Sequence, residues 1–539
     1  MHRRSSSRRS RTTPHARRPG AALACAAATL AAALLAACGS GDDGPQDGPQ
    51  DSKGPQDSKG AQDSKGRQGS ERAAPGGAGS RAPVITPTAT APVPRGKGSE
   101  LPDDLNGDGY PELVLPLVES KEEVQPTRLA FVHGSSRGLN PATRSVLTRD
   151  DLGLPARGAD VTPVDSTRIA TADLDGDGYA DLVTPLAERL SEADSDRLHT
   201  NARTVPYITW GGADGPRRGA AATRAGLTGP DDSVELQRPT VGDFDGDGHH
   251  DLAMVRADRA SFLVLYGPFG RDGRAARAVP YQSPLDSGGQ VGELVADAID
   301  AKRPADDGGR PTDLVVHAMN DDDQSASVLL TAGPDGLART GHKLREGNAI
   351  AFGDFDGDGL RDVAVGDSGT RNNEPGYETE APEVDHTLSV YTRKALKDAA
   401  PATRDASPQP IKIVNMTGGL AAADTDGDGT DELAVALEAG GAEIITIRPD
   451  SPGDIAHRHT LTRTAPARVD GEKIRKPRRA ARLHGAHDFD QDGKDEVVLA
   501  WGRDAVFALY GDRPEWWWIT DGTADRTAFS GKPFTTDTH

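Results

Sequence analysis

Short apolar runs punctuate the chain between residues 101 and 511, and turn-forming residues bound each of them. One set of runs lies directly after acidic loops, at 113–115, 182–184, 252–255, 363–365, 433–435 and 497–499. Apolar runs of this length between turns are typical of buried β-strands. The pattern therefore predicts an all-β chain in which each acidic loop joins two strands of a hairpin.

The acidic loops recur along the chain at a nearly regular spacing. Their starts, including one damaged copy at Asp297, are 69, 70, 54, 57, 70 and 64 residues apart, which gives a mean repeat of 64 residues. A second set of apolar runs follows within the repeats, at 129–132, 206–210, 262–266, 327–330, 388–391, 444–447 and 506–510. About 64 residues with four short strands is the size of one propeller blade with long loops. Seven repeats therefore predict a seven-bladed β-propeller over residues 99–539.

Six of the loops share a nine-residue pattern, with oxygen-bearing side chains at positions 1, 3, 5 and 9 and glycine at position 6. Oxygens at positions 1, 3 and 5 of a tight loop converge on one point, and the glycine allows the sharp turn. The residue at position 7 offers its carbonyl, and the acid at position 9 closes the shell. Sites rich in carboxylate oxygen suit Ca²⁺ better than transition metals. We therefore predict six calcium sites.

The expected ligands occupy positions 1, 3, 5, 7 and 9 of each loop. They are Asp104, Asn106, Asp108, Tyr110 and Glu112; Asp173, Asp175, Asp177, Tyr179 and Asp181; Asp243, Asp245, Asp247, His249 and Asp251; Asp354, Asp356, Asp358, Leu360 and Asp362; Asp424, Asp426, Asp428, Thr430 and Glu432; and Asp488, Asp490, Asp492, Lys494 and Glu496. An acidic turn without a metal is the alternative for any single copy. Six copies in register favour the metal.

These loops differ from the EF-hand, which needs a bidentate Glu at position 12. That position holds Leu115, Thr184, Met254, Val365, Val435 and Leu499. Each loop instead runs directly into an apolar strand. The metal site is therefore expected between the first two strands of a blade.

One repeat resembles a known family closely. The stretch Phe-Gly-Asp-Phe-Asp-Gly-Asp-Gly at 352–359, followed by Asp-Val-Ala-Val-Gly at 362–366, resembles the FG-GAP or VCBS-type repeat. This family builds the N-terminal propeller of integrin α subunits and many bacterial surface proteins, and the resemblance covers residues 101 to 511. It implies a propeller with Ca²⁺ in the loop between the first two strands of a blade. It says almost nothing about the ligand.

The fourth repeat departs from the loop pattern. If Asp297 takes position 1, then positions 3 and 5 are Ile299 and Ala301, neither of which offers a side-chain ligand. The acid that precedes the next strand, Asp313, follows sixteen residues after Asp297 rather than eight. We therefore predict a fourth blade without this metal.

Residues 1–37 have the pattern of an export signal. Seven arginines and no acid accompany an uncharged Ala- and Leu-rich run at 21–37, which is short for a membrane span of roughly 20 residues and suits a signal peptide. The run ends in Leu-Ala-Ala-Cys at 35–38, which resembles the lipobox of bacterial lipoproteins. An ordinary secretory signal with a chance cysteine is the alternative. The resemblance implies an acylated Cys38 that anchors the protein to the outer face of the cell membrane.

Residues 38–98 are polar and nearly free of bulky apolar side chains. They contain related six-residue repeats at 48–53, 54–59 and 60–65. Because such a segment has little apolar surface to offset the entropy of ordering, we predict a disordered linker over 38–98. It would hold the folded domain away from the membrane.

The chain is acidic, with a formal net charge of −21, and of −28 without the arginine-rich residues 1–37. Such a charge repels nucleic acid and anionic lipid and attracts cations. The two cysteines, Cys25 and Cys38, both lie near the N-terminus, so no disulfide can hold the folded region. Bound metal is the expected substitute.

The sequence offers little that points to catalysis. The stretch Gly-Asp-Ser-Gly at 366–369 echoes a serine-nucleophile turn but ends a blade strand, and the chain has no His-Glu-x-x-His pair, Walker loop or nucleophile elbow. We therefore expect a non-enzymatic, monomeric binding or adhesion module for a protein or glycan ligand, with no nucleic-acid partner. A propeller-based enzyme acting on polysaccharide and a structural element of a surface assembly are the alternatives.

The lipid anchor gives a first testable prediction. Mature protein should begin at Cys38 and partition with membranes, because two or more acyl chains form a stable anchor. The variant Cys38→Ala should be released or left unprocessed. Intact-mass analysis of the purified product checks this, and unmodified Cys38 in a soluble wild-type product would contradict it.

Overall fold

The computed structural model describes residues 81–117, 128–155, 169–227, 232–235, 239–299, 310–319, 324–369, 386–398, 410–414, 416–448, 455–502 and 514–537. All of them belong to one compact unit, Ala73–His539. The expected signal peptide, Cys38 and most of the expected linker lie outside the described residues. None of the described helices is long and apolar enough to cross a membrane.

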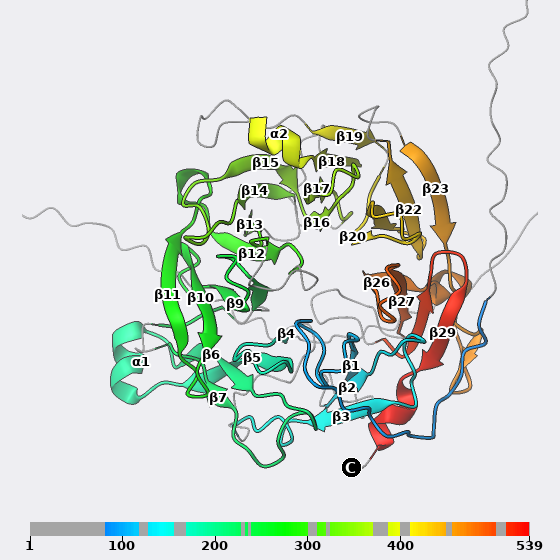
Figure 1. The fold of residues 1–539 in the computed structure, drawn as a ribbon, viewed down its shortest axis with the longest axis horizontal. Helices are drawn as coiled ribbons and strands as arrows, with labels where there is room; N and C mark the ends of the chain where they lie inside the picture. The colour runs from blue at the N-terminus through cyan, green and yellow to red at the C-terminus, as the bar shows by residue number, and fades with distance from the viewer. Residues whose placement is uncertain are drawn as a thin grey trace, which may run out of the picture. The chain divides into compact units, whose positions relative to one another are not determined.

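Seven antiparallel sheets form the blades of a β-propeller, in agreement with the repeats (Figure 1). In chain order the blades are β1 (Leu113–Leu117), β2 (Arg128–Val132) and β3 (Arg144–Thr148); β4 (Ala170–Ala172), β5 (Asp181–Arg189), β6 (Ala202–Thr209) and β7 (Thr223–Arg224); β8 (Thr240–Gly242), β9 (Asp251–Val255), β10 (Ser261–Phe269) and β11 (Ala275–Gln282); β12 (Val291–Ala296), β13 (Leu314–Ala318), β14 (Ser325–Leu330) and β15 (His342–Gly347); β16 (Ala349–Gly353), β17 (Asp362–Gly366), β18 (Thr387–Tyr391) and β19 (Ile411–Val414); β20 (Leu420–Ala423), β21 (Glu432–Ala436), β22 (Ala442–Ile447) and β23 (Ile455–Leu461); and β26 (Arg482–His487), β27 (Glu496–Trp501), β28 (Trp516–Thr520) and β29 (Asp525–Ser530).

Each blade is built from consecutive strands, so neighbours in the chain are neighbours in the sheet. A small hairpin, β24 (Arg468–Val469) and β25 (Glu472–Lys473), lies between blades 6 and 7. Two helices, α1 (Glu192–Leu198) and α2 (Arg393–Asp398), and three short 3-10 helices, η2 (Asp286–Gly288), η4 (Lys476–Arg479) and η6 (Lys532–Thr536), decorate the sheets.

Two details differ from the sequence prediction. Blade 1 has three strands, because the chain before its acidic loop, which contains Pro102, forms no regular strand. Proline lacks the N–H that a strand needs for its ladder. In blade 7 the third strand is β28, which contains Trp516, Trp517 and Trp518, and the run predicted at 506–510 lies outside the described residues.

The second strand of each blade is buried because sheets cover it on both faces. Every residue of β9 is buried, and β9 pairs with β8 on one side and β10 on the other. In the outer strand β11, by contrast, most side chains are exposed. This explains why the second strands read as continuous apolar runs in the sequence.

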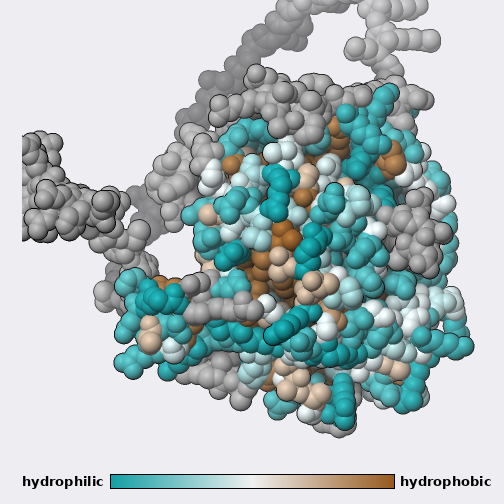
Figure 2. All heavy atoms as spheres, turned by 60° about the vertical axis from the view of Figure 1, so that its left-hand side comes forward, coloured by the Kyte–Doolittle hydropathy of each residue, from teal (hydrophilic) through white to brown (hydrophobic). Residues whose placement is uncertain are grey.

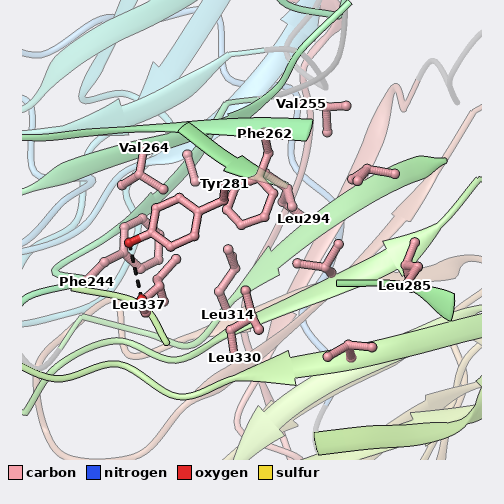
Figure 3. Close-up of a cluster of buried hydrophobic side chains, with 14 of the residues drawn as sticks. Phe244, Val255, Phe262, Val264, Tyr281, Leu285, Leu294, Leu314, Leu330 and Leu337 are labelled. Carbon is pink, nitrogen blue, oxygen red and sulfur yellow. Dashed lines mark hydrogen bonds between the residues drawn. The ribbon is translucent and has the colours of Figure 1, made fainter. Parts of the chain in front are cut away.

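The hydrophobic core is divided into seven clusters, and each cluster lies between two consecutive blades. Figure 3 shows the cluster between blades 3 and 4, where Phe244 and Tyr281 meet Leu314 and Leu330, and the Tyr281 hydroxyl donates to the Leu337 carbonyl at 3.2 Å. Phe244 explains the glycine two residues before it, since a Cβ on Gly242 would come within 2.5 Å of its ring.

The cluster between blades 7 and 1 closes the ring. Phe489, Trp517 and Phe529 of blade 7 pack with Phe534 of η6 against apolar residues of β1, β2 and β3. The surface outside these clusters is largely hydrophilic on the face shown in Figure 2, where hydrophobic side chains gather in one narrow hollow. The ring is therefore held by packing between blades rather than by a covalent link.

Residues 81–98 form a strap that joins the blades at the closure; we call them the N-terminal strap. Ile85 exchanges two backbone hydrogen bonds with β29, and the Ala91 N–H donates to the Ala142 carbonyl beside β3 at 2.7 Å. The strap, dark blue in Figure 1, follows the outer edges of blades 7 and 1. The linker predicted to reach residue 98 thus has defined contacts from residue 81 onward. Composition misses this because the strap is stabilised by the backbone groups of strand edges.

The C-terminus adds an ion pair to the same closure. The Arg144 Nε lies 2.6 Å from Asp537 Oδ2, its Nη2 donates to Asp537 Oδ1 at 3.1 Å, and its guanidinium lies 4.2 Å from the Phe534 ring centroid. The Arg144 side chain is 1% exposed. A bidentate pair in this setting fixes the last residues against blade 1.

Removal of this ion pair should weaken the ring. Arg144→Ala leaves Asp537 without its partner and a gap beside Phe534, so we expect the free energy of unfolding to fall by roughly 2–4 kcal/mol. Urea unfolding monitored by tryptophan fluorescence measures it. Arg137→Ala, at an exposed side chain, is the matched control and should change stability by less than about 0.5 kcal/mol. Equal effects in the two variants would contradict this role.

Candidate metal centres

The first Asp of each acidic loop organises the turn. In blade 2, Asp173 Oδ1 accepts from the Asp177 N–H at 3.1 Å and Oδ2 accepts from the Gly178 N–H at 2.7 Å. The bond to the position-6 glycine recurs at 2.6–3.0 Å in the loops that begin at Asp104, Asp243, Asp354, Asp424 and Asp488. The six loops therefore share one conformation.

Glycine at position 6 is required by this conformation. Its φ lies between 79° and 89° in all six loops, in the left-handed region that other residues rarely adopt. A Cβ on Gly109 or Gly359 would meet nothing within 4 Å, so the backbone rather than space sets the requirement. Position 4 is also left-handed, and in the last loop Gln491 takes it with a φ of 54°, its side-chain amide donating to the Asp488 carbonyl.

The acid at position 9 fixes the loop to the blade. In every loop one of its oxygens accepts from the N–H of position 2, at 2.5–3.0 Å. In blades 2 and 3 the other oxygen accepts from the chain at the end of the third strand: Asp181 from the Gly211 N–H and Asp251 from the Gly267 N–H. These acids are buried, and they join the loop, the second strand and the third strand.

In blades 3, 4, 6 and 7 the residue at position 8 contacts the first Asp of the preceding blade, and sequence reasoning missed this. The Asp173 N–H donates to His250 Nδ1 at 2.9 Å, and the Asp424 N–H donates to Asp495 Oδ2 at 2.9 Å. Thr312 and Asp431 hold Asp243 and Asp354 in the same way. Position 8 shows no common residue type, so the repeat pattern gives no signal for it.

Carboxylates from positions 1, 3 or 5, and 9 come together within five of the six loops. Oxygens that lie within 4.8 Å of one another come from Asp104, Asp108 and Glu112; Asp173, Asp175 and Asp181; Asp243, Asp245 and Asp251; Asp354, Asp356 and Asp362; and Asp424, Asp426 and Glu432. In the first loop Asp108 takes the place of the neutral Asn106. These groups could hold a metal ion, as the spacing predicts.

Position 3 presents a free oxygen to the centre of several loops. Oδ1 of Asp175, Asp245 and Asp490 is buried and has no hydrogen-bond partner. The other oxygen of Asp175 pairs with Arg271, and that of Asp245 lies 2.7 Å from Arg277 Nη2. Both Asp side chains are 10% exposed. An unpartnered buried carboxylate oxygen is costly unless something binds it.

Position 7 is oriented by position 5 in all six loops. The backbone N–H of each position-7 residue donates to the position-5 carboxylate at 2.8–3.2 Å; these residues are Tyr110, Tyr179, His249, Leu360, Thr430 and Lys494. Coordination through their carbonyls stays a prediction.

The electrostatics of the loops favour a bound cation. Burial, with the neighbouring carboxylates adding to it, raises the pKa of Asp181, Asp251, Asp362 and Glu496 to about 8. Burial also raises the pKa of Asp175 and Asp245. Each loop thus gathers carboxyl groups that repel one another when ionised, and a divalent cation would relieve this.

In blade 4 both buried acids pair with arginine. Asp297 is buried, and its two oxygens lie 2.9 Å from Arg361 Nε and 2.6 Å from Arg310 Nη1. Asp313 forms an ion pair with Arg393. Arginine thus pairs with both acids of this blade. That the fourth blade binds no metal stays a prediction.

Comparisons with known proteins add little. No protein-family profile matches the chain, and no curated protein matches it. Similar solved structures include the exotype rhamnogalacturonan lyase YesX, with 14% identity, a TM-score of 0.27, and coverage of 78% of this chain and 81% of that chain. A mutant of AofleA from Arthrobotrys oligospora has 9% identity and a TM-score of 0.28, and the match covers 81% of this chain and 95% of that chain. The Dos1 propeller has 8% identity and a TM-score of 0.28, and the match covers 76% of this chain and 93% of that chain. Similarities at these TM-scores support no conclusion about this chain.

The raised pKa values predict an unusual pH dependence for metal-free protein. An acid whose pKa is raised from 3.8–4.5 to about 8 stabilises the fold fully at pH below about 4, and this contribution is lost as the pH rises through 8. In excess chelator, the free energy of unfolding should therefore fall between about pH 7.5 and 8.5 by roughly 1.4 kcal/mol per pH unit for each proton released.

The control for this prediction removes one titrating group. Asp181→Asn keeps the side-chain shape and should flatten the slope, while Asp335→Asn, at an exposed position, should leave it unchanged. Burial lowers the pKa of His133, His250 and His317 to about 4. In the unfolded state these histidines titrate near pH 6.5 and there make stability rise with pH, so the slopes are compared above about pH 7.5, where this contribution is small. A stability that rises with pH over this range in chelator would contradict the prediction.

Proposed function

We propose that the six loops bind Ca²⁺ and that the chain is a calcium-stabilised propeller of the FG-GAP/VCBS type. One observation carries this proposal: Oδ1 of Asp175, Asp245 and Asp490 is buried without a partner at the same position of three loops. In the other three loops the equivalent oxygen accepts only a long hydrogen bond from the position-5 N–H, at 3.2–3.3 Å, so the turn leaves this oxygen weakly satisfied. A repeated oxygen that is unpartnered and buried indicates a ligand that binds it.

The donor chemistry supports Ca²⁺ over transition metals. The convergent groups contain carboxylates alone, without histidine or cysteine, and hard oxygen ligands suit Ca²⁺. Backbone N–H groups and the arginines Arg271 and Arg277 orient the carboxylates from outside. Such outer contacts fix the ligands before the ion arrives.

We further propose that the propeller is displayed on the cell surface by a lipid at Cys38 and serves as a binding or adhesion module for a protein or glycan. A cavity of about 810 Å³ lies between the innermost strands of blades 2, 3, 4 and 7. Its lining includes Asp103, Glu293 and His487, and among the described lining residues there is no lysine, arginine or tyrosine. A propeller-based lyase would need a cluster of basic, tyrosine or histidine side chains to stabilise a developing negative charge. Among the described lining residues His487 is the single residue of these types, so we favour binding over catalysis.

Calcium stoichiometry tests the metal sites directly. Six Ca²⁺ per chain are expected, and chelation should lower the melting temperature markedly, because one site at 100 times its Kd adds about 2.7 kcal/mol to folding. Equilibrium dialysis with elemental analysis measures the stoichiometry, and calorimetry measures the melting temperature.

A paired substitution locates the ions. Asp175→Asn should reduce the stoichiometry by one, because it removes a charged ligand from one loop. Asp335→Asn, with the same chemical change at an exposed residue outside the loops, should not alter it. Zero to two Ca²⁺ per chain would overturn the proposal.

A further inference from the structure

The connection between blades 6 and 7 carries a cluster of positive charge in an otherwise acidic chain. Between Arg463 and Arg482 there are eight basic and two acidic residues. Six of the basic side chains are exposed: Arg468, Lys473, Arg475, Lys476, Arg478 and Arg482. We call these six residues the basic platform. They lie on or next to the β24–β25 hairpin, η4 and the start of β26.

The platform is a rigid part of the fold. Ala465 donates to the Arg479 carbonyl at 2.8 Å, Ala481 donates to the Arg463 carbonyl at 3.0 Å, and Trp501 Nε1 donates to the Arg478 carbonyl at 2.7 Å. Ala465 and Ala481 belong to the core cluster between blades 6 and 7. The charges are therefore held in place, unlike those of a solvated loop.

The charges of the platform are available to a partner. None of its six side chains forms an ion pair with another residue in the part of the chain that the structure describes. Within the same segment Asp470 is engaged by Lys532, and the buried Arg463 is engaged by Asp525 at 2.8 Å. Among the described residues, the neighbouring charges Arg463 and Asp470 are thus paired, whereas the six side chains of the platform form no ion pair.

The N-terminal strap begins beside the platform. Arg81 Nη2 lies 3.4 Å from the Thr462 carbonyl, and the Ala82 N–H donates to Asp525 at 3.1 Å. Ala82 and Val84 pack on the same core cluster as Ala465. A tether that runs back from residue 81 toward Cys38 therefore leaves the folded unit next to six exposed cations.

The shape and composition of the platform favour a surface as its partner. No aromatic residue occurs between residues 463 and 482, and the nearby Trp501 is buried in the core cluster between blades 6 and 7, so it presents no open ring face for stacking on a glycan. The adjoining cavity, lined by Arg478, Arg482 and Trp501, measures about 160 Å³ and admits only a small group. Anionic headgroups require exposed cations and no groove.

From these observations we propose that the basic platform docks the propeller on the anionic phospholipid headgroups of a membrane, next to the exit of the tether. Docking goes beyond the proposed calcium and ligand binding and does not require them. Guanidinium groups pair well with phosphate because their donors match its oxygens.

The acidity of the whole chain does not prevent this docking. At physiological ionic strength, screening limits the electrostatic interactions of exposed charges to distances of about 8 Å. A membrane in contact with the platform therefore interacts with the charges of the platform rather than with the net charge of −21 of the whole chain. The remaining acidic surface is repelled, so the platform also sets the orientation of the propeller.

Vesicle binding by the chain from Gly39 onward tests the proposal. This chain contains the whole unit Ala73–His539 and omits the basic residues 1–37. It should sediment with phosphatidylglycerol vesicles and not with phosphatidylcholine vesicles, and binding should weaken as salt rises above about 0.1 M. The platform variant carries Lys473→Gln, Arg475→Gln, Lys476→Gln and Arg478→Gln. Its partition coefficient should fall at least about 50-fold, since each cation near an anionic membrane contributes roughly fivefold.

The matched control carries Arg137→Gln, Arg217→Gln, Lys397→Gln and Lys412→Gln, which changes the net charge equally and should lower binding less than about threefold. Equal losses in both variants, or binding through Ca²⁺ bridges that neither variant changes, would overturn the proposal. Binding of soluble polygalacturonate with vesicles unbound would assign the platform to a polymer and overturn it as well. If the fourfold variant does not fold, Arg475→Gln and Lys476→Gln singly should each reduce binding about fivefold.

Discussion

The hydrogen bond between the ninth-position acid and the second-position N–H controls the geometry of this propeller. It occurs in all six acidic loops at 2.5–3.0 Å. The second residue is Leu105, Leu174, Phe244, Phe355 or Phe489 in five of them, and each of these side chains enters the core between its own blade and the next. One buried carboxylate therefore couples the candidate metal site to the packing between blades.

This coupling explains how a chain without a disulfide in its folded region can hold a seven-bladed ring. The position-8 contacts join the loops of successive blades, and the seven core clusters join the blades beneath them. Between blades 4 and 5 the direction is reversed: the positively charged Arg361, at position 8 of blade 5, donates to the Asp297 carboxylate of blade 4. Blade 4 therefore keeps its place in the ring through arginine pairs, without the acidic loop pattern of the other blades.

Much of the fold follows from the sequence because its determinants are local. The acidic pattern requires particular residues at particular spacings, so the register of the loops and second strands was predictable from residues such as Asp354, Gly359 and Asp362. The N-terminal strap was not, because Ile85 pairs with a strand more than 400 residues away. The roles of Arg271 and Arg277 were equally unpredictable, because both residues lie outside the repeat motif and contact acids of the loops. Long-range contacts made by ordinary residues leave no periodic signal.

The distribution of charge follows from the topology of a blade. The acidic loops precede the second strands, whereas Gly440 and Gly441 follow the end of β21 and lie beside Ala481 of the platform segment. In blade 6, β21 therefore separates the acidic loop from the end of the blade that lies beside the platform segment. Cations bound in the loops would neutralise charge at the acidic end and leave the charge of the platform unchanged. Metal binding would therefore increase the contribution of the platform to the remaining surface charge. A net charge summed over the chain hides this separation, and only the placement of the residues on the blades reveals it.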